Sequence, residues 1–229
     1  MKKTTQVLII GGGFAGVSAA QELEKHGVST ILVDKKNYFE VTFATLRNIA
    51  APEKTKDSAR KSYHHFLHGT FIQAGVDKLS ATSARLDNGN EITFDKVIIA
   101  SGTRYPTLPA AKPTNTLDIL QRNQEMKDYH QRLINASNVL IIGGGVVGVE
   151  LAGEIAYAMP KSSITLAHNS NVLLDGFKPK AQQKAHKQLE SLGVNVIFNN
   201  RFTEHNGSYI DEKSQHSLTP DMVFTATGV

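Results

Sequence analysis

The hydrophobic positions near the start of the chain form short continuous runs separated by glycine. Val7–Ile10 is such a run, and continuous rather than alternating apolar residues are typical of a parallel strand buried on both faces. Three glycines follow at once, and residues 14–26 then predict a helix, with Gly27 as its C-terminal stop. Thr30–Val33 predicts the next strand. The order strand, glycine turn, helix, strand indicates a βαβ unit.

The second half of the chain repeats this pattern. Gln6–Leu23 and Asn138–Ile155 match at a constant offset of 132 residues, with eleven of eighteen positions identical. A second pair of segments, Asp95–Thr103 and Asp221–Val229, gives each half an apolar strand that ends in Ala-Ser-Gly or Ala-Thr-Gly. The second unit is expected to comprise a strand at 139–142, a helix at 146–158, which Pro160 stops, and a strand at 164–166.

A proline-containing connector separates the two repeats. Residues 103–113 contain Pro106, Pro109 and Pro113, which favour an extended segment, and a polar helical stretch follows at 114–136. We therefore expect an α/β protein with two Rossmann-like dinucleotide-binding units in tandem. The boundary is expected to divide residues 1–104 from residues 105–229.

Each repeat carries a G-x-G-x-x-G motif between its strand and its helix, which is the context that this motif requires. The first glycine permits a tight turn, the second lets the backbone approach a pyrophosphate, and the third lets the helix pack closely on the strand. The pyrophosphate then lies on the unpaired N–H groups of the helix N-terminus. The motif glycines are Gly11, Gly13 and Gly16 in the first copy and Gly143, Gly145 and Gly148 in the second.

The two copies differ at the end of the strand that follows the helix. In the first copy Asp34 lies 18 residues after Gly16, where a carboxylate is expected to bind ribose hydroxyls; the alternative is a turn residue at the strand end. In the second copy His168 and Asn169 take this place. A carboxylate at this position would favour NADH, and an arginine would favour NADPH. Neither is present, so the sequence does not decide between NADH and NADPH. His168 is either a phosphate ligand when protonated or an ordinary surface residue.

Composition excludes several classes of protein. The chain has no cysteine, which excludes disulfides, thiolate metal sites and a redox-active dithiol, and we expect no bound metal. The formal net charge is only +4 and the basic residues are spread out, so we expect no nucleic-acid partner. The densest basic stretch, residues 178–187, is interpreted as a solvated helix face, with contact to an anionic membrane as the alternative. The first apolar run is too short for a signal peptide or membrane helix, which predicts a cytoplasmic protein.

Two dinucleotide motifs in one chain, each followed by an Ala-Ser/Thr-Gly strand, resemble the two-domain pyridine nucleotide-disulfide oxidoreductase superfamily. Local segments are similar to its apoptosis-inducing-factor-2-like (ferroptosis-suppressor-like) branch, with the type II NADH dehydrogenases more distant. These segments are Asp34-Lys35-Lys36, Ala44–Arg47, Gly148–Glu154 and Ile164–His168. The resemblance covers essentially the whole chain.

The resemblance implies that the first copy binds FAD and the second NAD(P)H. Around FAD it places Gly11, Gly13, Phe14, Ala15, Gly16, Asp34, Lys35, Arg47, Val76 and Gly102. Around NAD(P)H it places Gly143, Gly145, Val147, Gly148, Glu154, His168 and Gly228. Glu150 is the candidate catalytic residue, since it would contact the nicotinamide; Glu150 and Glu154 share a helix face and alternatively form a structural, solvent-facing pair. Arg47 is otherwise a surface arginine.

The absence of cysteine excludes the disulfide reductases and sulfide:quinone reductases of this superfamily. What remains is hydride transfer from NAD(P)H to FAD and on to a small-molecule acceptor, a quinone by resemblance. Members normally continue past Val229 with a further part that touches the flavin, so we expect the FAD domain to be incomplete. For a longer form the resemblance implies a peripheral membrane contact and a homodimer. The alternative is a truncated dinucleotide-binding or redox-sensing protein with little turnover.

Overall fold

The computed structural model describes residues 2–228, except the side chains of residues 56 and 57. It divides into two compact units, each described here by itself. The first contains the residues up to 41, residues 57–104 and residues 115–123; the second contains residues 42–56, 105–114 and those from 124 onward. This division is more interleaved than the single expected boundary after residue 104, because residues 42–56 pack with the second repeat. Val229, which ends the repeated closing segment, lies outside the described residues.

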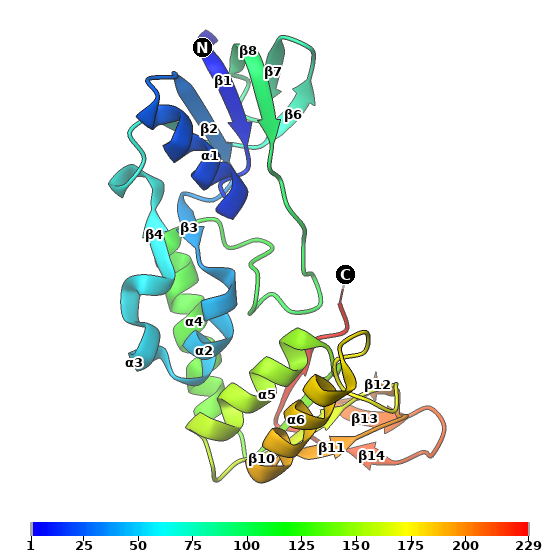
Figure 1. Ribbon diagram of the computed structural model, residues 1–229. Helices are drawn as coiled ribbons and strands as arrows, with labels where there is room; N and C mark the ends of the chain where they lie inside the picture. Colours follow the sequence, from blue (N-terminus) through cyan, green and yellow to red (C-terminus); the bar gives the residue numbers. More distant parts are fainter. Residues whose placement is uncertain (1, 229) are drawn as a thin grey trace. The chain divides into compact units, whose positions relative to one another are not determined.

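The first unit is built on a six-stranded sheet in the order β5-β2-β1-β8-β7-β6 (Figure 1). The first four of these strands are parallel, and β7 and β6 continue the sheet in antiparallel fashion. Helix α1 (Phe14–Lys25) joins β1 to β2. The strands are β1 (Lys2–Ile10), β2 (Thr30–Asp34), β5 (Thr70–Gln73), β6 (Val76–Leu79), β7 (Ser83–Leu86) and β8 (Glu91–Ile99).

Both faces of β1 and β2 are buried, as the continuous apolar runs predict. Leu8 packs with Ile31 and Val33 in one core cluster. The alternate residues Ile9 and Leu32 pack in another. Because successive side chains of a strand point to opposite faces, this division places apolar layers on each side of the sheet.

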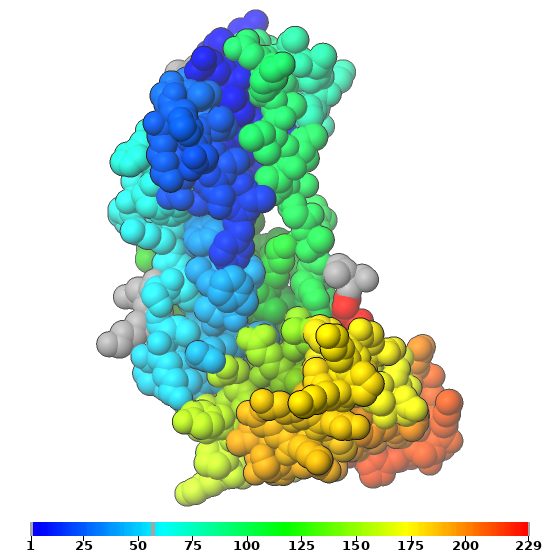
Figure 2. All heavy atoms as spheres, in the orientation of Figure 1, coloured from blue at the N-terminus to red at the C-terminus, as the bar shows by residue number. Residues whose placement is uncertain are grey.

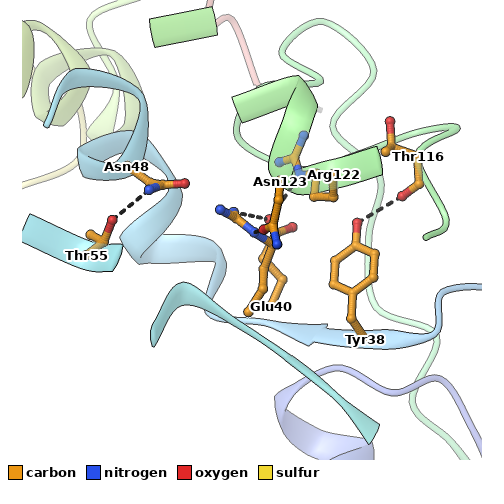
Figure 3. A network of polar contacts seen from close by, with 8 residues as sticks. Tyr38, Glu40, Asn48, Thr55, Thr116, Arg122 and Asn123 are labelled. Carbon is orange, nitrogen blue, oxygen red and sulfur yellow. Dashed lines mark hydrogen bonds and ion pairs between the residues drawn. The ribbon is translucent and has the colours of Figure 1, made fainter. Parts of the chain in front are cut away.

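A buried charge cluster holds the shorter elements of the first unit (Figure 3). Strands β3 (Tyr38–Glu40) and β4 (Arg60–Ser62) pair in antiparallel fashion. Glu40 Oε1 accepts hydrogen bonds from Arg60 Nη1 at 3.0 Å and from Arg122 Nε at 2.9 Å. All three side chains are almost completely buried, so removing Glu40 would deprive two buried guanidinium groups of the carboxylate that they share. Two 3-10 turns, η2 (Lys56–Ala59) and η3 (Tyr63–His65), flank β4.

The second unit has a four-stranded parallel sheet in the order β11-β10-β9-β15. Its strands are β9 (Asn138–Ile142), β10 (Ser163–Ala167), β11 (Asn195–Ile197) and β15 (Met222–Thr225). A separate antiparallel sheet contains β12 (Phe202–His205), β13 (Ser208–Asp211) and β14 (Ser217–Leu218). The helices are η1 (Thr42–Ala44), α2 (Thr45–Ala50), α3 (Pro52–Thr55), α5 (Val146–Ala158) and α6 (Pro179–Ser191). Helix α4 (Ile119–Ile134) contributes its first residues to the first unit.

Most elements of the two predicted βαβ units are confirmed, and the connector differs from expectation. Helix α5 has the expected bounds and α1 ends one residue early, at Lys25. The connector forms turns instead of an extended segment, and it buries Leu108 and Ala110 in the core of the second unit. Burial of these apolar side chains outweighs the preference of its prolines for extended backbone.

Helix α6 lies on the surface of its unit, where it is seen in gold in Figure 2. Lys180, Lys184 and Lys187 are exposed along it. This agrees with the interpretation of the basic stretch as a solvated helix face. Within residues 2–228, no helix combines the length and the apolar character that crossing a membrane requires.

Candidate dinucleotide-binding site

The first glycine turn joins β1 to α1 with little room for side chains. Gly11 has φ +105°, a conformation that other residues rarely adopt, and a Cβ there would overlap the Ala100 carbonyl oxygen. A Cβ on Gly16 would overlap the Gly11 carbonyl oxygen. The Gly11 N–H donates to the Val33 carbonyl at 2.8 Å. The first and third motif glycines are therefore fixed by packing of the strand, turn and helix.

The middle of this turn is fixed by two side chains. The Gly12 N–H donates to Asp34 Oδ2 at 2.6 Å, and Asp34 Oδ1 accepts from the Lys36 N–H at 2.7 Å. The Gly12 carbonyl accepts a hydrogen bond from the buried Tyr63 hydroxyl at 2.7 Å. Burial, followed by the charge of Asp34, raises the pKa of Tyr63, which keeps the hydroxyl protonated as a donor. Asp34 thus stands at the turn, where the sequence predicts a ribose ligand.

The second glycine turn, between β9 and α5, has the same construction. Gly143 has φ +118° and its N–H donates to the Ala167 carbonyl at 2.8 Å. A Cβ on Gly148 would overlap the Gly143 carbonyl oxygen. The Gly144 carbonyl accepts from the Leu174 N–H at 2.8 Å, where the first copy uses a tyrosine hydroxyl. The internal repeat in the sequence is therefore a repeat of backbone geometry.

Both turns have the features that a pyrophosphate requires. Gly13 and Gly145 are the N-caps of α1 and α5, and neither makes a side-chain cap hydrogen bond. A Cβ built on either meets nothing within 4 Å, so the open side of each turn would admit a ligand. An uncapped N-terminus with its positive dipole end favours an anion. Of the further predicted residues, the partly exposed Val147 and Gly228 line the opening beside the second turn, and Phe14 and Ala15 are exposed at the start of α1.

A cavity of about 760 Å³ opens beside the second turn. A volume of this size accommodates a cofactor-sized ligand. The chain segments that follow β9, β10, β11 and β15 supply most of its wall. These segments contribute Gly143–Val147, His168, Asn169, residues 200–201 and Thr227–Gly228; residues 202–203 of β12 and Glu212 after β13 also line the cavity. The cavity therefore lies at the carboxyl ends of parallel strands, where open α/β sheets bind their ligands.

His168 takes the position in the second copy that Asp34 takes in the first. The Gly144 N–H donates to His168 Nδ1 at 3.1 Å, just as the Gly12 N–H donates to Asp34. Nδ1 therefore carries no proton, and burial lowers the pKa of the ring against the opposing charge of Asp175. His168 Nε2 is buried and has no hydrogen-bond partner within the part of the chain that is described. The neutral ring belongs to the turn and has one N–H to offer.

Arg47, Glu150 and Glu154 lie together in the second unit, on α2 and α5. The Arg47 guanidinium binds Glu154 through two nitrogens, with Nη2–Oε1 at 2.7 Å and Nε–Oε2 at 3.1 Å. Burial, then the charge of Glu154, raises the pKa of Glu150, and Arg47 opposes this shift. All three line a second cavity, of about 590 Å³. Their expected contacts with flavin or nicotinamide stay predictions.

The remaining predicted residues of the first copy lie near its turn or at the end of its sheet. The Lys35 side chain runs against Gly75, directly before Val76 at the start of β6. Gly102 follows β8 with φ +65°, as Gly228 follows β15 with φ +93°. These matching backbone conformations show that the Ala-Ser/Thr-Gly segments of the two halves are equivalent.

The comparisons with known proteins agree with this geometry. A family model described as pyridine nucleotide-disulphide oxidoreductase matches residues 5–229. The chain belongs to this family. Ferroptosis suppressor protein 1 of Xenopus tropicalis is 30% identical over 246 residues, covering 100% of this chain and 64% of that protein. Apoptosis-inducing factor homolog A of Dictyostelium discoideum is 30% identical over 203 residues, covering 86% of this chain and 49% of that protein.

Solved structures of pyridine nucleotide oxidoreductase fold are similar over almost the whole chain. Reduced CoADR-RHD of Bacillus anthracis matches with a TM-score of 0.80 at 16% identity, covering 98% of this chain and 44% of that chain. NDH2 of Plasmodium falciparum, solved in complex with NADH, matches with a TM-score of 0.73 at 18% identity, covering 98% and 55%. The predicted α/β fold and the predicted family resemblance are confirmed, and this chain spans about half to two thirds of the relatives named here.

Three residues at the two turns and the larger cavity were not predicted from the sequence. Tyr63 and Leu174 hold the carbonyl groups of the two turns, and Arg201 stands in the wall of the larger cavity. Tyr63 and Leu174 are 51 and 30 residues from their partners, and neither belongs to the motif. The sequence signal for Arg201 is indirect: His168 stands where an acid is expected, and the missing acid is the only reason to look for a cation nearby.

Proposed function

We propose that this chain is the nucleotide-binding portion of an FAD-dependent NAD(P)H oxidoreductase. The first copy binds FAD and the second binds NAD(P)H, and the complete enzyme transfers hydride from NAD(P)H to FAD and electrons on to a quinone. The observation that carries the proposal is the occurrence of the same uncapped glycine turn twice, with a carboxylate beside one turn and a neutral histidine beside the other.

The residues of the first copy fit an adenine dinucleotide with a free ribose 2′-hydroxyl. Asp34 accepts two backbone N–H groups and keeps further lone pairs for ribose hydroxyls. Its negative charge beside the turn would repel a 2′-phosphate. The α1 N-terminus would hold the pyrophosphate, and Tyr63 would keep the turn in position. FAD, when bound here, would supply the two-electron redox chemistry.

The residues of the second copy would position the nicotinamide nucleotide rather than react with it. The N-terminus of α5 would bind the pyrophosphate, and the cavity wall would enclose the adenosine part. Glu150, two residues after Gly148 on the same helix, would contact the nicotinamide end. Burial, followed by the charge of Glu154, raises the pKa of this carboxyl. Holding the reacting carbon in place is the main contribution expected of such a site.

A binding experiment with two single variants tests whether the sites are separate. Purified chain is titrated with FAD and, separately, with NADPH and NADH. Asp34→Ala is expected to weaken FAD binding by roughly tenfold, since it removes a charge-assisted hydrogen-bond acceptor, and to leave the nicotinamide nucleotides unchanged. Equal loss of all three ligands, or no FAD binding by the unaltered chain, would contradict the proposal for this chain.

The acceptor is tested with the full-length protein. Membership of the pyridine nucleotide-disulphide oxidoreductase family supports an electron-transfer role, and a soluble quinone is the acceptor we expect. NAD(P)H oxidation that rises with quinone concentration supports this part of the proposal. Oxidation by oxygen alone, at a rate that quinone does not change, would favour a redox-sensing protein with little turnover.

A further inference from the structure

Arg201 is held beside the end of β10 by a set of backbone hydrogen bonds. The His168 N–H donates to the Ile197 carbonyl at 2.8 Å. The Asn199 N–H then donates to the Ser170 carbonyl, and the Asn200 N–H donates to the His168 carbonyl, both at 3.1 Å. The segment after β11 therefore runs alongside the segment after β10. Arg201, the next residue, lies beside the place where the ribose-binding residue of such a fold stands.

The backbone of Arg201 is itself fixed on both sides. Its N–H donates to Asp211 Oδ1 at 2.8 Å, and its carbonyl accepts from the Glu212 N–H at 3.0 Å. Asp211 is buried, and its other oxygen accepts from the Ser214 hydroxyl and N–H and from the Lys213 N–H. Arg201 thus extends from a rigid point, and its exposed side chain lines the cavity of about 760 Å³.

The first copy of the motif serves as an internal reference for the charge at this position. There the Gly12 N–H meets the carboxylate of Asp34, and in the second copy the Gly144 N–H meets the neutral ring of His168. The second copy therefore lacks the negative charge that would repel a ribose 2′-phosphate. Arg201 adds a guanidinium nearby, and guanidinium groups bind phosphate through paired hydrogen bonds.

We propose that the second copy selects NADPH over NADH, with Arg201 binding the 2′-phosphate and His168 leaving room for it. The inference rests on the proposed function, because it names the preferred cofactor of the same site. Glu212 lines the same cavity, and its negative charge would repel the 2′-phosphate. This repulsion limits the preference for NADPH over NADH.

The experiment compares dissociation constants for NADPH and NADH, and for the smaller pair adenosine 2′,5′-bisphosphate and AMP, at one fixed salt concentration. Each pair differs only by the 2′-phosphate. The unaltered chain is expected to bind the phosphorylated member about tenfold more tightly or better. Arg201→Gln should abolish this ratio by weakening NADPH alone. His168→Asp should lower the ratio as well, and Glu212→Gln should raise it.

Lys213→Gln is the matched control, because it removes the same charge from the adjoining turn between β13 and β14, at a residue outside the cavity wall. It should leave the ratio nearly unchanged. NADH binding reports that each variant is folded. Equal affinity for NADPH and NADH in the unaltered chain, or equal effects of the Arg201 and Lys213 variants, would overturn the inference while the proposed function stands. Binding of neither nucleotide would overturn both.

Discussion

Two glycines on one helix should respond in opposite ways to the same substitution. Gly148 and Gly153 both lie in α5. A Cβ on Gly153 would have Leu189 Cδ2 as its nearest neighbour, at 3.8 Å, which is ordinary contact. A Cβ on Gly148 would overlap the Gly143 carbonyl oxygen and stand 3.0 Å from the carbonyl carbon. The close approach of helix and turn therefore tolerates no side chain at Gly148.

The magnitudes follow from helix propensity and overpacking. Replacing a helical glycine by alanine stabilises a helix by about 0.8–1 kcal/mol where the side chain fits. Gly153→Ala should therefore raise the free energy of unfolding by up to about 1 kcal/mol. At Gly148 the same gain is opposed by an overpacking cost of about 1–3 kcal/mol or more, since the neighbour is backbone and cannot rotate away. Gly148→Ala should be destabilising by about 1–2 kcal/mol and should weaken NADPH binding.

Urea unfolding followed by circular dichroism gives both free energies, with the slope compared to verify that the denatured state is unchanged. The informative quantity is the difference between the two variants, about 2–3 kcal/mol if the propensity and overpacking magnitudes are right. If Gly148→Ala were as stable as Gly153→Ala, the third motif glycine would not be required for packing. The account of the turn as a sterically closed phosphate cradle would then be refuted.

Three further substitutions test the surroundings of the turns. Tyr63→Phe should cost about 1–3 kcal/mol by urea unfolding, because it leaves the buried Gly12 carbonyl without its donor, whereas Tyr157→Phe on the surface should cost almost nothing. Glu150→Gln should raise the melting temperature at pH 7 and leave it unchanged below about pH 4. Folding raises the pKa of Glu150, so the protonated acid is fully tolerated below its ordinary pKa. Its contribution to the free energy of unfolding then declines as the pH rises through the pKa of the folded state. No change at pH 7 would contradict the stated burial. Arg47→Gln should cost at most about 1 kcal/mol because its ion pair is half exposed, and a loss well above that would show a deeper role.

The sequence was sufficient for the elements whose signal is local. Apolar runs and glycine spacing predict β1, α1, β9 and α5, because a buried parallel strand and a tight turn both restrict which residues can occur. The end of the strand that follows each helix also predicts that Asp34 and His168 are equivalent, and each indeed accepts a hydrogen bond from the second residue of its turn.

Other features depend on contacts between segments far apart in the chain. Residues 42–56 pack with the second repeat through Leu46, Ile49 and Ala50, and their own sequence does not indicate which core they join. The connector was expected to be extended because its prolines can be read from the sequence. The buried sites that accept Leu108 and Ala110 cannot be read from it. Backbone hydrogen bonds between the segments after β10 and β11 place Arg201 at the cavity, and no rule of sequence spacing describes such contacts.

The most direct test of the central claim is the visible absorption spectrum of the chain reconstituted with FAD, recorded without oxygen before and after NADPH is added. We expect a bound flavin whose absorption band is bleached by NADPH, because the two proposed nucleotide sites belong to this one chain. A bound flavin that stays oxidised with excess NADPH would contradict it, even if both nucleotides were shown to bind.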